Sequence, residues 1–260
     1  MNIDLTGKHA VVCGSTQGIG KCTAMALAEM GASITLVARN EEKLKTVLAE
    51  LPANDQHDYL VADFEKSNEL EQKINEWAKN KTAHILVNNT GGPKGGPIRE
   101  AGLDEFKSAF NNHLICNHIL VTALWKGMKD AGYGRIINVI STSVKQPLDG
   151  LGVSNTVRGA VANWSKTLAN ELGQFNITVN NVLPGATNTV RLQSIAENKA
   201  AQSSGIDVAE IFSNMAAQSP MKRIAEPEEI ANAIAFLASP AASYINGINV
   251  PVDGGRTKSL

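Results

Sequence analysis

The feature that most constrains the fold is a strict alternation of short, β-branched apolar runs with longer stretches of helical period. Runs such as Ile85-Leu86-Val87 are apolar at every position, which is typical of strands covered on both faces of a parallel sheet. Alternation of strands and helices predicts an α/β fold with an open, doubly wound sheet. We therefore expect a single domain over residues 1–260, with seven parallel strands and helices on both faces.

The boundaries of the expected elements follow from residues that favour strands or end helices. Gly31 lies where a left-handed C-cap would end the first helix, and Pro227 lies where a first-turn proline is tolerated. The expected strands are His9–Cys13, Ser33–Ala38, Asp58–Ala62, His84–Asn88, Arg135–Ile140, Thr178–Leu183 and Gly247–Val252. The expected helices are Gly18–Met30, Glu41–Leu51, Asn68–Lys79, Leu103–Lys129, Leu151–Leu172 and Pro227–Ala238.

Charge and cysteine content narrow the range of partners. The chain holds 24 Lys and Arg against 25 Asp and Glu, which gives no electrostatic footprint for nucleic acid or an anionic membrane. The cysteines, Cys13, Cys22 and Cys116, form no CxxC pair and have no neighbouring His at ligand spacing, so we expect reduced thiols and no metal site. The N-terminus lacks a signal-peptide layout and no apolar run reaches the length of a membrane span. These features predict a cytoplasmic protein with small-molecule partners.

A glycine-rich turn lies between the first expected strand and the first expected helix. Its residues are Gly14, Ser15, Thr16, Gln17, Gly18, Ile19 and Gly20. Glycines permit unusual backbone angles and close approach to a ligand, and the helix start offers free N–H groups and a positive dipole to a pyrophosphate. The strand–turn–helix context favours a Rossmann-type NAD(P) site, with a turn that binds no ligand as the alternative.

Further motifs follow the later strands and the last helix. They are Asn88-Asn89-Thr90-Gly91, Pro184-Gly185-Ala186-Thr187-Asn188-Thr189, Pro227-Glu228-Glu229-Ile230, Phe236-Leu237-Ala238-Ser239 and Val252-Asp253-Gly254-Gly255. With these motifs the chain resembles the short-chain dehydrogenase/reductases over nearly its whole length, and most of all their β-ketoacyl-carrier-protein reductase branch. The resemblance implies a NAD(P) cofactor held by residues 14–20 and by Asn89, Gly91, Arg158, Pro184, Gly185, Thr187 and Thr189.

The end of the second expected strand bears on the choice between NAD and NADP. An acidic side chain there would accept hydrogen bonds from the ribose hydroxyls of NAD, but the position holds Ala38. Arg39 and Asn40 follow, and Arg39 is suited to pair with a 2′-phosphate. We therefore expect NADP(H), with a solvated Arg39 as the alternative. The resemblance implies that Asp63 contacts the adenine, and a simple loop cap is its alternative role.

The resemblance also marks four catalytic positions, and this chain departs from the family at three of them. The family's tyrosine and lysine positions hold Ser154 and Arg158, its asparagine position holds His113, and its serine position holds Ser141, with Ser143 as a second candidate. A serine hydroxyl is a far weaker acid than tyrosine, whose pKa is about 10. Arginine stays charged and cannot shuttle a proton. All four residues are polar and can form hydrogen bonds, which indicates altered catalytic chemistry rather than loss of the site.

His113 is the side chain at these positions that we expect to titrate near neutral pH. A proton path from His113 through water to Ser154 and the substrate is one hypothesis, and a buried histidine with a purely structural role is the alternative. Asn112 is one residue away, which on an α-helix turns it about 100° from His113. Tyr59 and Tyr133 are not placed to replace the missing phenol.

Two segments near the expected cleft have less specific signals. The loop 91–97 contains four glycines and two prolines, and its Lys94 is either a contact for an anionic substrate group or part of a plain connector. By resemblance, residues 186–215 form a lid that covers the substrate. The resemblance also implies a homodimer or a homotetramer.

Three functions are compatible with these observations. The first is an NADP(H)-dependent oxidoreductase, similar to a 3-oxoacyl reductase, that reduces a carbonyl or oxidises an alcohol. The second is a cofactor-binding pseudo-enzyme that acts as a nucleotide sensor or scaffold. The third is a lyase or isomerase that uses the nucleotide without redox chemistry. Retained polarity at the four catalytic positions favours the first, because the site and not the fold decides function.

Overall fold

The computed structural model describes residues 1–202 and 207–259, and one seven-stranded parallel sheet runs through it. The sheet order is β3-β2-β1-β4-β5-β6-β7. The strands are β1 (His9–Cys13), β2 (Ser33–Ala38), β3 (Asp58–Val61), β4 (Ile85–Asn88), β5 (Gly134–Val139), β6 (Ile177–Pro184) and β7 (Asn249–Val252). The order reverses between β1 and β4, so the predicted doubly wound Rossmann fold is confirmed.

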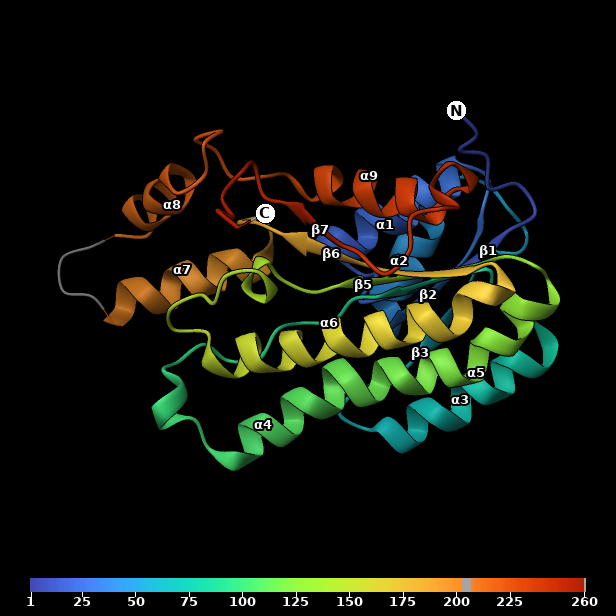
Figure 1. Ribbon diagram of the computed structural model, residues 1–260, viewed down its shortest axis with the longest axis horizontal. Coiled ribbons are helices and arrows are strands. Elements are labelled where there is room, and N and C mark those ends of the chain that lie inside the picture. The colour runs from blue at the N-terminus through green and yellow to red at the C-terminus, as the bar shows by residue number, and fades with distance from the viewer. Residues whose placement is uncertain (203–206, 260) are drawn as a thin grey trace.

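Helices cover both faces of the sheet (Figure 1). One face carries α1 (Gly18–Glu29), α2 (Glu41–Glu50) and α9 (Pro227–Ala238). The other face carries α3 (Ser67–Asn80), α4 (Leu103–Phe110), α5 (Cys116–Asp130) and α6 (Gly152–Leu172). Two more helices, α7 (Val190–Gln202) and α8 (Val208–Ala217), lie beyond one end of the sheet.

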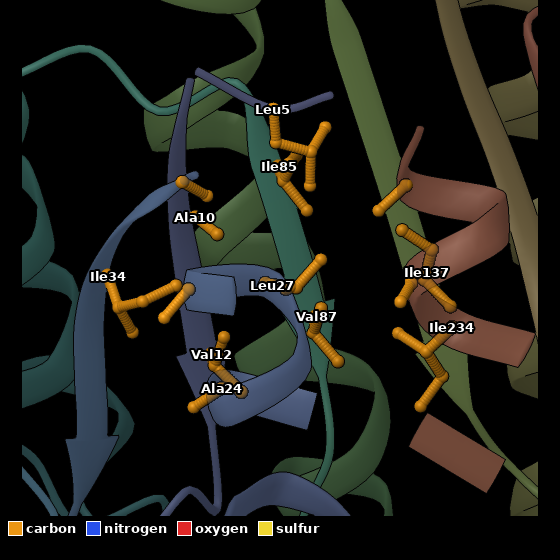
Figure 2. Packing of buried hydrophobic residues seen from close by; sticks show 14 of the residues in the cluster. Leu5, Ala10, Val12, Ala24, Leu27, Ile34, Ile85, Val87, Ile137 and Ile234 are labelled. Atoms are coloured by element: carbon orange, nitrogen blue, oxygen red, sulfur yellow. The ribbon is translucent and has the colours of Figure 1, made fainter. Parts of the chain in front are cut away.

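The sheet separates two apolar cores. On the α1 side, Leu27 of α1 and Ile234 of α9 pack on strand residues such as Val12 and Ile137, all nearly or fully buried (Figure 2). On the α5 side, side chains such as Leu120 fill the space between the helices and the same strands. Burying one such aliphatic side chain contributes about 1.5–3 kcal/mol. The two cores fix the sheet between its helices and leave the strand ends free to carry loops.

Four asparagine amides form a hydrogen-bonded ladder across β4, β5, β6 and β7. Asn88 Nδ2 donates to Asn138 Oδ1 at 2.8 Å, and Asn138 Nδ2 donates to Asn181 Oδ1 at 2.9 Å. Asn181 Nδ2 donates to Asn249 Oδ1 at 2.8 Å. The same residues are direct partners in the strand pairing, so the ladder marks one register across four strands. A slip by one residue would turn an amide to the opposite face and leave its partner unsatisfied.

The helix expected over Leu103–Lys129 contains an irregularity that the sequence did not predict. Its middle, Asn111–Ile115, is a π-helical turn that joins α4 to α5. Asn111 Nδ2 donates to the Phe64 carbonyl at 2.7 Å, and Cys116 Sγ donates to the same carbonyl. Single π-turns inside α-helices occur frequently at functional sites. This turn carries His113, one of the four catalytic positions.

The proposed lid, residues 186–215, contains two helices where the sequence predicted none. Helix α7 is rich in Ala and Gln, which favour helices, and Asp207 caps α8 by accepting from the Glu210 N–H at 2.7 Å. Residues 203–206 of this segment lie outside the described part of the chain.

Cys13, Cys22 and Cys116 form no disulfide bond. Within residues 1–202 and 207–259 there is no group of three His, Cys, Asp or Glu side chains arranged to hold a metal ion. None of the helices described combines the length and the apolar character needed to cross a membrane.

Candidate functional site

A cleft of about 1370 Å³ opens at the carboxyl ends of the strands. It is lined by the turns that follow β1, β2, β3, β4 and β6, by the end of β5, by the π-helical turn and by α6 and α7. Open α/β sheets bind their ligands at this edge, beside the point where the strand order reverses. The cleft therefore coincides with the site predicted from the sequence motifs.

The glycine turn has the geometry that its sequence predicts. Gly14 has φ +60° and Gly18 has φ +52°, both in the left-handed region that favours glycine. A Cβ at Gly20 would lie 2.2 Å from the Gly14 carbonyl oxygen, so Gly20 permits the helix to pack against the turn. Asn89 Nδ2 donates to the Cys13 carbonyl at 3.2 Å and holds the turn against the end of β4.

The start of α1 is suited to bind a pyrophosphate. Its N-cap, Gln17, makes no side-chain capping bond, and the first turn contains no acidic residue. Free N–H groups and the helix dipole are therefore available to an anion, as an NAD(P) pyrophosphate requires. Of the predicted turn residues, Gly14, Thr16, Gln17, Gly18 and Ile19 line the cleft. Ser15 is fully buried behind it, and Gly20 contributes packing rather than cleft surface.

Two cations, one directly after β2 and one in the first turn of α2, lie where the sequence predicted the contact that distinguishes NAD from NADP. Arg39 is exposed and lines the cleft, together with Lys43 one helical turn later. Neither forms an ion pair with a carboxylate in the part of the chain described. Asn40 lines the cleft and caps α2 by accepting from the Lys43 N–H at 2.9 Å. Asp63 lines it too and caps its own loop through the Glu65 N–H at 3.1 Å.

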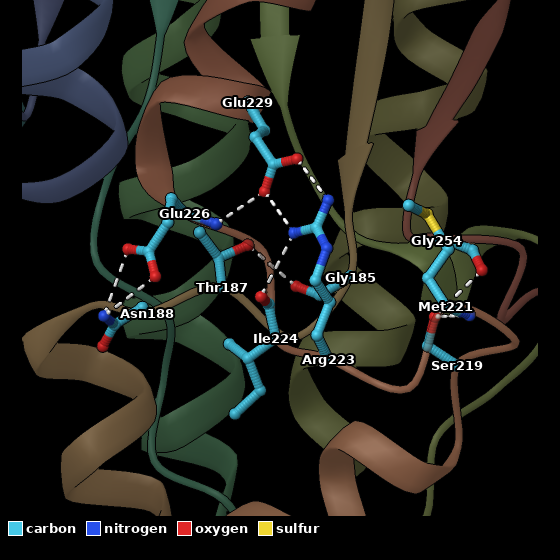
Figure 3. A network of polar contacts seen from close by, with 10 residues as sticks. All are labelled: Gly185, Thr187, Asn188, Ser219, Met221, Arg223, Ile224, Glu226, Glu229 and Gly254. Atoms are coloured by element: carbon cyan, nitrogen blue, oxygen red, sulfur yellow. Dashed lines mark hydrogen bonds and ion pairs between the residues drawn. The ribbon is translucent and has the colours of Figure 1, made fainter.

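A network of polar contacts holds the segment after β6 against the start of α9 (Figure 3). Arg223 binds the Glu229 carboxylate with both terminal nitrogens at 2.6 Å, and this pairing lowers the pKa of Glu229 to about 2. Glu229 also accepts from the Glu226 N–H at 2.9 Å, and Glu226 accepts from Asn188 Nδ2 at 3.1 Å. The predicted cofactor residues that this segment presents to the cleft are Pro184, Gly185, Thr187 and Thr189.

The four catalytic positions converge on the same cleft, which is lined by His113, Ser141, Ser154 and Arg158. Between the two candidate serines, Ser141 faces the cleft, while Ser143 is buried and is not among the lining residues. Ser141 Oγ accepts from the Ser143 N–H at 3.1 Å, which fixes the side chain at the end of β5.

Arg158 is a buried cation that faces the cleft. Its side chain is 8% exposed, and Nη1 donates to the Val139 carbonyl at 2.9 Å. Its Nε has no hydrogen-bond partner. Burial, and then the positive charge of Arg191, lowers the pKa of Arg158 to about 10. The guanidinium is therefore still charged at neutral pH.

His113 does not titrate near neutral pH, and that expectation is wrong. Burial lowers its pKa to about 2, helped by the positive charges of Arg158 and Arg191. The imidazole is 2% exposed, and its Nδ1 has no hydrogen-bond partner. The ring is thus neutral, buried at the cleft and lacks the carbonyl partner expected of a purely structural histidine.

Asn112, next to His113 on the π-helical turn, lines the cleft as well. The tyrosines lie elsewhere. Tyr133 donates to the Ala238 carbonyl at 2.7 Å, and Tyr59 donates to Glu41 at 3.0 Å. Tyr244, the third tyrosine, is fully exposed. None of the three, all within the described residues, lines the cleft.

Several cleft residues belong to no motif. Lys43 could have been found only by its spacing from Arg39, and Arg191 only by its place two residues after the Pro184–Thr189 turn. Lys94 of the glycine-proline loop lines the cleft, as does Lys199 of α7. The cleft lining thus contains cations that the sequence motifs do not predict.

The depressed pKa of His113 predicts how stability depends on pH. An unfolded histidine binds a proton near pH 6.5 and folded His113 does so near pH 2, so folding is opposed as pH falls below 6.5. Between pH 7 and pH 5 this group should lower the free energy of unfolding by about 2 kcal/mol. Urea unfolding should therefore show that His113→Asn loses about 2 kcal/mol less than the unmodified protein over this interval. His118→Asn, at an exposed position, is the matched control, and equal losses for all three proteins would contradict the assignment.

Comparison with known proteins agrees with the geometry of this cleft. A family model described as enoyl-(acyl carrier protein) reductase matches residues 14–257. Glucose 1-dehydrogenase of Gluconobacter oxydans (strain 621H) is 34% identical, over 96% of this chain and 92% of that protein. The 3-oxoacyl-[acyl-carrier-protein] reductase FabG of Vibrio harveyi is 31% identical, over 97% of this chain and 98% of that protein.

A solved structure matches the whole fold as well. L-sorbose reductase from Gluconobacter frateurii, complexed with NADPH and L-sorbose, has a TM-score of 0.91 and 32% identity over 100% of both chains. The sheet order agrees with this match. The chain belongs to the short-chain dehydrogenase/reductase family of NAD(P)-dependent oxidoreductases, which act on carbonyl and alcohol groups.

Proposed function

We propose that the protein is an NADPH-dependent reductase of a carbonyl compound that works without a catalytic tyrosine. The observation that carries this proposal is the buried, charged Arg158 at the cleft, next to the Ser154 position one helical turn earlier on α6. A fixed positive charge there would stabilise the negative charge that develops on a carbonyl oxygen during reduction. A site that had lost its chemistry would have no reason to keep such a charge buried.

The cofactor site supports NADP(H) in particular. The left-handed Gly14 and Gly18 and the uncapped start of α1 fit a pyrophosphate, while Arg39 and Lys43 fit a 2′-phosphate. Asp63 and Asn40 would face the adenosine, and Asn89, Gly91 and the Pro184–Thr189 turn would face the nicotinamide end. When bound, NADPH supplies the hydride that reduces the carbonyl carbon.

Ser154 and Arg158 would together take the roles of the tyrosine and lysine that the family has at these positions. Arg158 can fork onto the nicotinamide ribose hydroxyls, and its charge acts on the carbonyl oxygen. Ser154 would donate a hydrogen bond to that oxygen, and Ser141 would orient the substrate from the end of β5. In the overall reaction the carbon accepts a hydride and the oxygen a proton, so the carbonyl becomes an alcohol and NADPH becomes NADP⁺.

His113 would serve as a neutral relay rather than as an acid. A neutral imidazole can accept a proton on one ring nitrogen and release another from the second nitrogen. Its Nδ1 is buried without a partner, but the residue lines the cleft, so the relay would use the part of the ring that faces the cleft. The imidazole would release one proton through water to Ser154 as it takes up another from solvent, and Ser154 would pass its own proton to the developing alkoxide.

The proposal includes a lid over the cleft and a homo-oligomer. Residues 186–215 would act as a lid, because Arg191, Lys199 and Met215 of this segment line the cleft. The homodimer or homotetramer is supported by exposed apolar side chains along the α4–α5 segment, namely Leu103, Phe110 and Ile115.

The preference for NADPH can be tested at Arg39 and Lys43. Arg39→Ala and Lys43→Ala should each raise the Kd for NADPH by about 10-fold, since each loses a charge-assisted contact with the 2′-phosphate. Binding of NADH should not change in either variant, as measured by nucleotide fluorescence titration. Lys45→Ala is the matched control on the same helix, because Lys45 pairs with Glu41 and does not line the cleft. Equal effects on NADPH and NADH would contradict the assignment.

The reaction itself is tested by following NADPH consumption with a panel of 3-oxoacyl thioesters, quinones, aldehydes and ketones. We expect consumption that depends on a particular carbonyl compound. Ser154→Ala and His113→Ala should lower kcat by about 100-fold or more, as expected for loss of a proton-transfer group, with little change in the Kd for NADPH. Ser143→Ala, at a buried serine outside the cleft, should leave kcat unchanged.

The opposite result favours a different class of function. Among the described residues no phenol lines the cleft, and this observation supports a cofactor-binding pseudo-enzyme. NADPH binding without consumption of any carbonyl compound, at any pH, would support a nucleotide sensor or scaffold. Full activity in Ser154→Ala and His113→Ala would leave a reductase but reject the relay.

A further inference from the structure

Arg191 reaches from the first turn of α7 to the loop that follows β4. Its Nη2 donates a hydrogen bond to the Pro93 carbonyl oxygen. Its guanidinium also lies over Gly92, with 3.4 Å between Nη2 and the place where a Cβ of that residue would stand. The guanidinium therefore lies against Gly92 and crosses between the proposed lid and the glycine-proline loop.

The same guanidinium lies close to the catalytic positions. Burial is the main cause of the lowered pKa of both His113 and Arg158, and the positive charge of Arg191 lowers both further. Arg191 lines the cleft with these two residues, and Lys94 and Lys199 line it as well. The substrate end thus contains a pair of guanidinium groups, from Arg158 and Arg191, with two lysines in the same lining.

The carboxylates of Asp104, Glu105 and Asp149 line the same cleft, but none of them pairs with these two guanidinium groups. Within the described residues, neither Arg158 nor Arg191 forms an ion pair. Arg158 is 8% exposed, and its Nε is unpartnered. Arg191 is exposed to the cleft, and its charge acts on the buried Arg158. A buried cation beside a second cation is unfavourable unless an anion neutralises them. The arrangement is therefore suited to bind an anion next to the reacting group.

In the proposed binding mode, the phosphates of the cofactor have donors elsewhere. The pyrophosphate has the start of α1, and the 2′-phosphate has Arg39 and Lys43. Arg191 also has one of its N–H groups committed to the Pro93 carbonyl, which holds the guanidinium in place. The rest of its donor fork matches the two oxygens of a carboxylate.

We propose that the substrate is an oxo acid, a carbonyl compound whose free carboxylate is held by Arg191 in the field of Arg158. This inference rests on the proposed reductase function and names its substrate class. Arg191 is the specificity-determining residue, while the reduction of the carbonyl proceeds at the Ser154 and Arg158 positions. The product is the corresponding hydroxy acid.

The test compares oxo acids with their uncharged methyl esters. Suitable pairs are 2-oxobutanoate, 3-oxobutanoate and 4-oxopentanoate, each with its methyl ester, because the spacing of carbonyl and carboxylate varies among them. With NADPH, the unmodified protein should use one acid with a kcat/KM at least about 10-fold above that of its ester. Arg191→Gln should remove this preference by lowering kcat/KM for the acid alone, and Arg191→Lys should restore part of it. Arg99→Gln, at an exposed arginine that pairs with Glu100, is the matched control.

A binding measurement separates this inference from the proposed reaction. Calorimetric titration of the NADP⁺-loaded protein should detect the acid but not the ester, and Arg191→Gln should lose the acid. Binding of the acid without turnover would reject the reductase and keep the anion site. Turnover of acid and ester at equal rates would reject the oxo acid and keep the reductase.

Two further outcomes also overturn the inference. If Arg191→Gln weakens NADPH binding and lowers turnover of acid and ester alike, Arg191 holds the cofactor and not the substrate. If neither turnover nor binding distinguishes acid from ester, the cleft does not select an anionic substrate.

Discussion

Asn138 stands at the centre of the amide ladder on which the geometry of the cleft depends. Its side chain accepts from Asn88 on β4 and donates to Asn181 on β6, all within the buried sheet. The residues that follow these amides are Asn89, Ile140–Ser141 and Pro184–Gly185, which form three walls of the cleft. Since a strand can slip only by breaking buried hydrogen bonds, the ladder sets the relative height of these walls. The site is therefore placed by the middle of the sheet, not by its own loops.

Electrostatics links the residues at the family's catalytic positions in this cleft. A lysine at position 158 could lose its proton when buried, but an arginine stays charged even with a pKa lowered to about 10. That permanent charge, with Arg191 nearby, helps to keep His113 neutral and makes it unfit as an acid. The same charge favours a developing alkoxide and attracts an anion. Replacing the lysine by arginine thus changes the proton chemistry and the substrate electrostatics together.

Local sequence patterns predict the strands and the cofactor turn. The features that they do not predict depend on contacts between residues far apart in the sequence. Apolar runs and glycine spacing predict the strands and the turn at Gly14–Gly20, because these depend on neighbours in sequence. The π-helical turn depends on a contact between Asn111 and the carbonyl of Phe64, 47 residues away. The neutral state of His113 depends on burial and on charges from α6 and α7, which sequence spacing cannot reveal. The role of Arg191 likewise requires its contact with Pro93 across the cleft.

In the proposed function, this cleft transfers a hydride from NADPH to a carbonyl carbon without a phenol to protonate the oxygen. The most direct measurement uses NADPH that carries deuterium at C4 of the nicotinamide, prepared in each of its two configurations. Mass spectrometry of the alcohol should find deuterium on the former carbonyl carbon with one configuration and none with the other, since the cleft would hold one face of the ring toward the substrate. An alcohol without deuterium from either form, or bound NADPH that yields no alcohol, would contradict hydride transfer from NADPH to the carbonyl carbon.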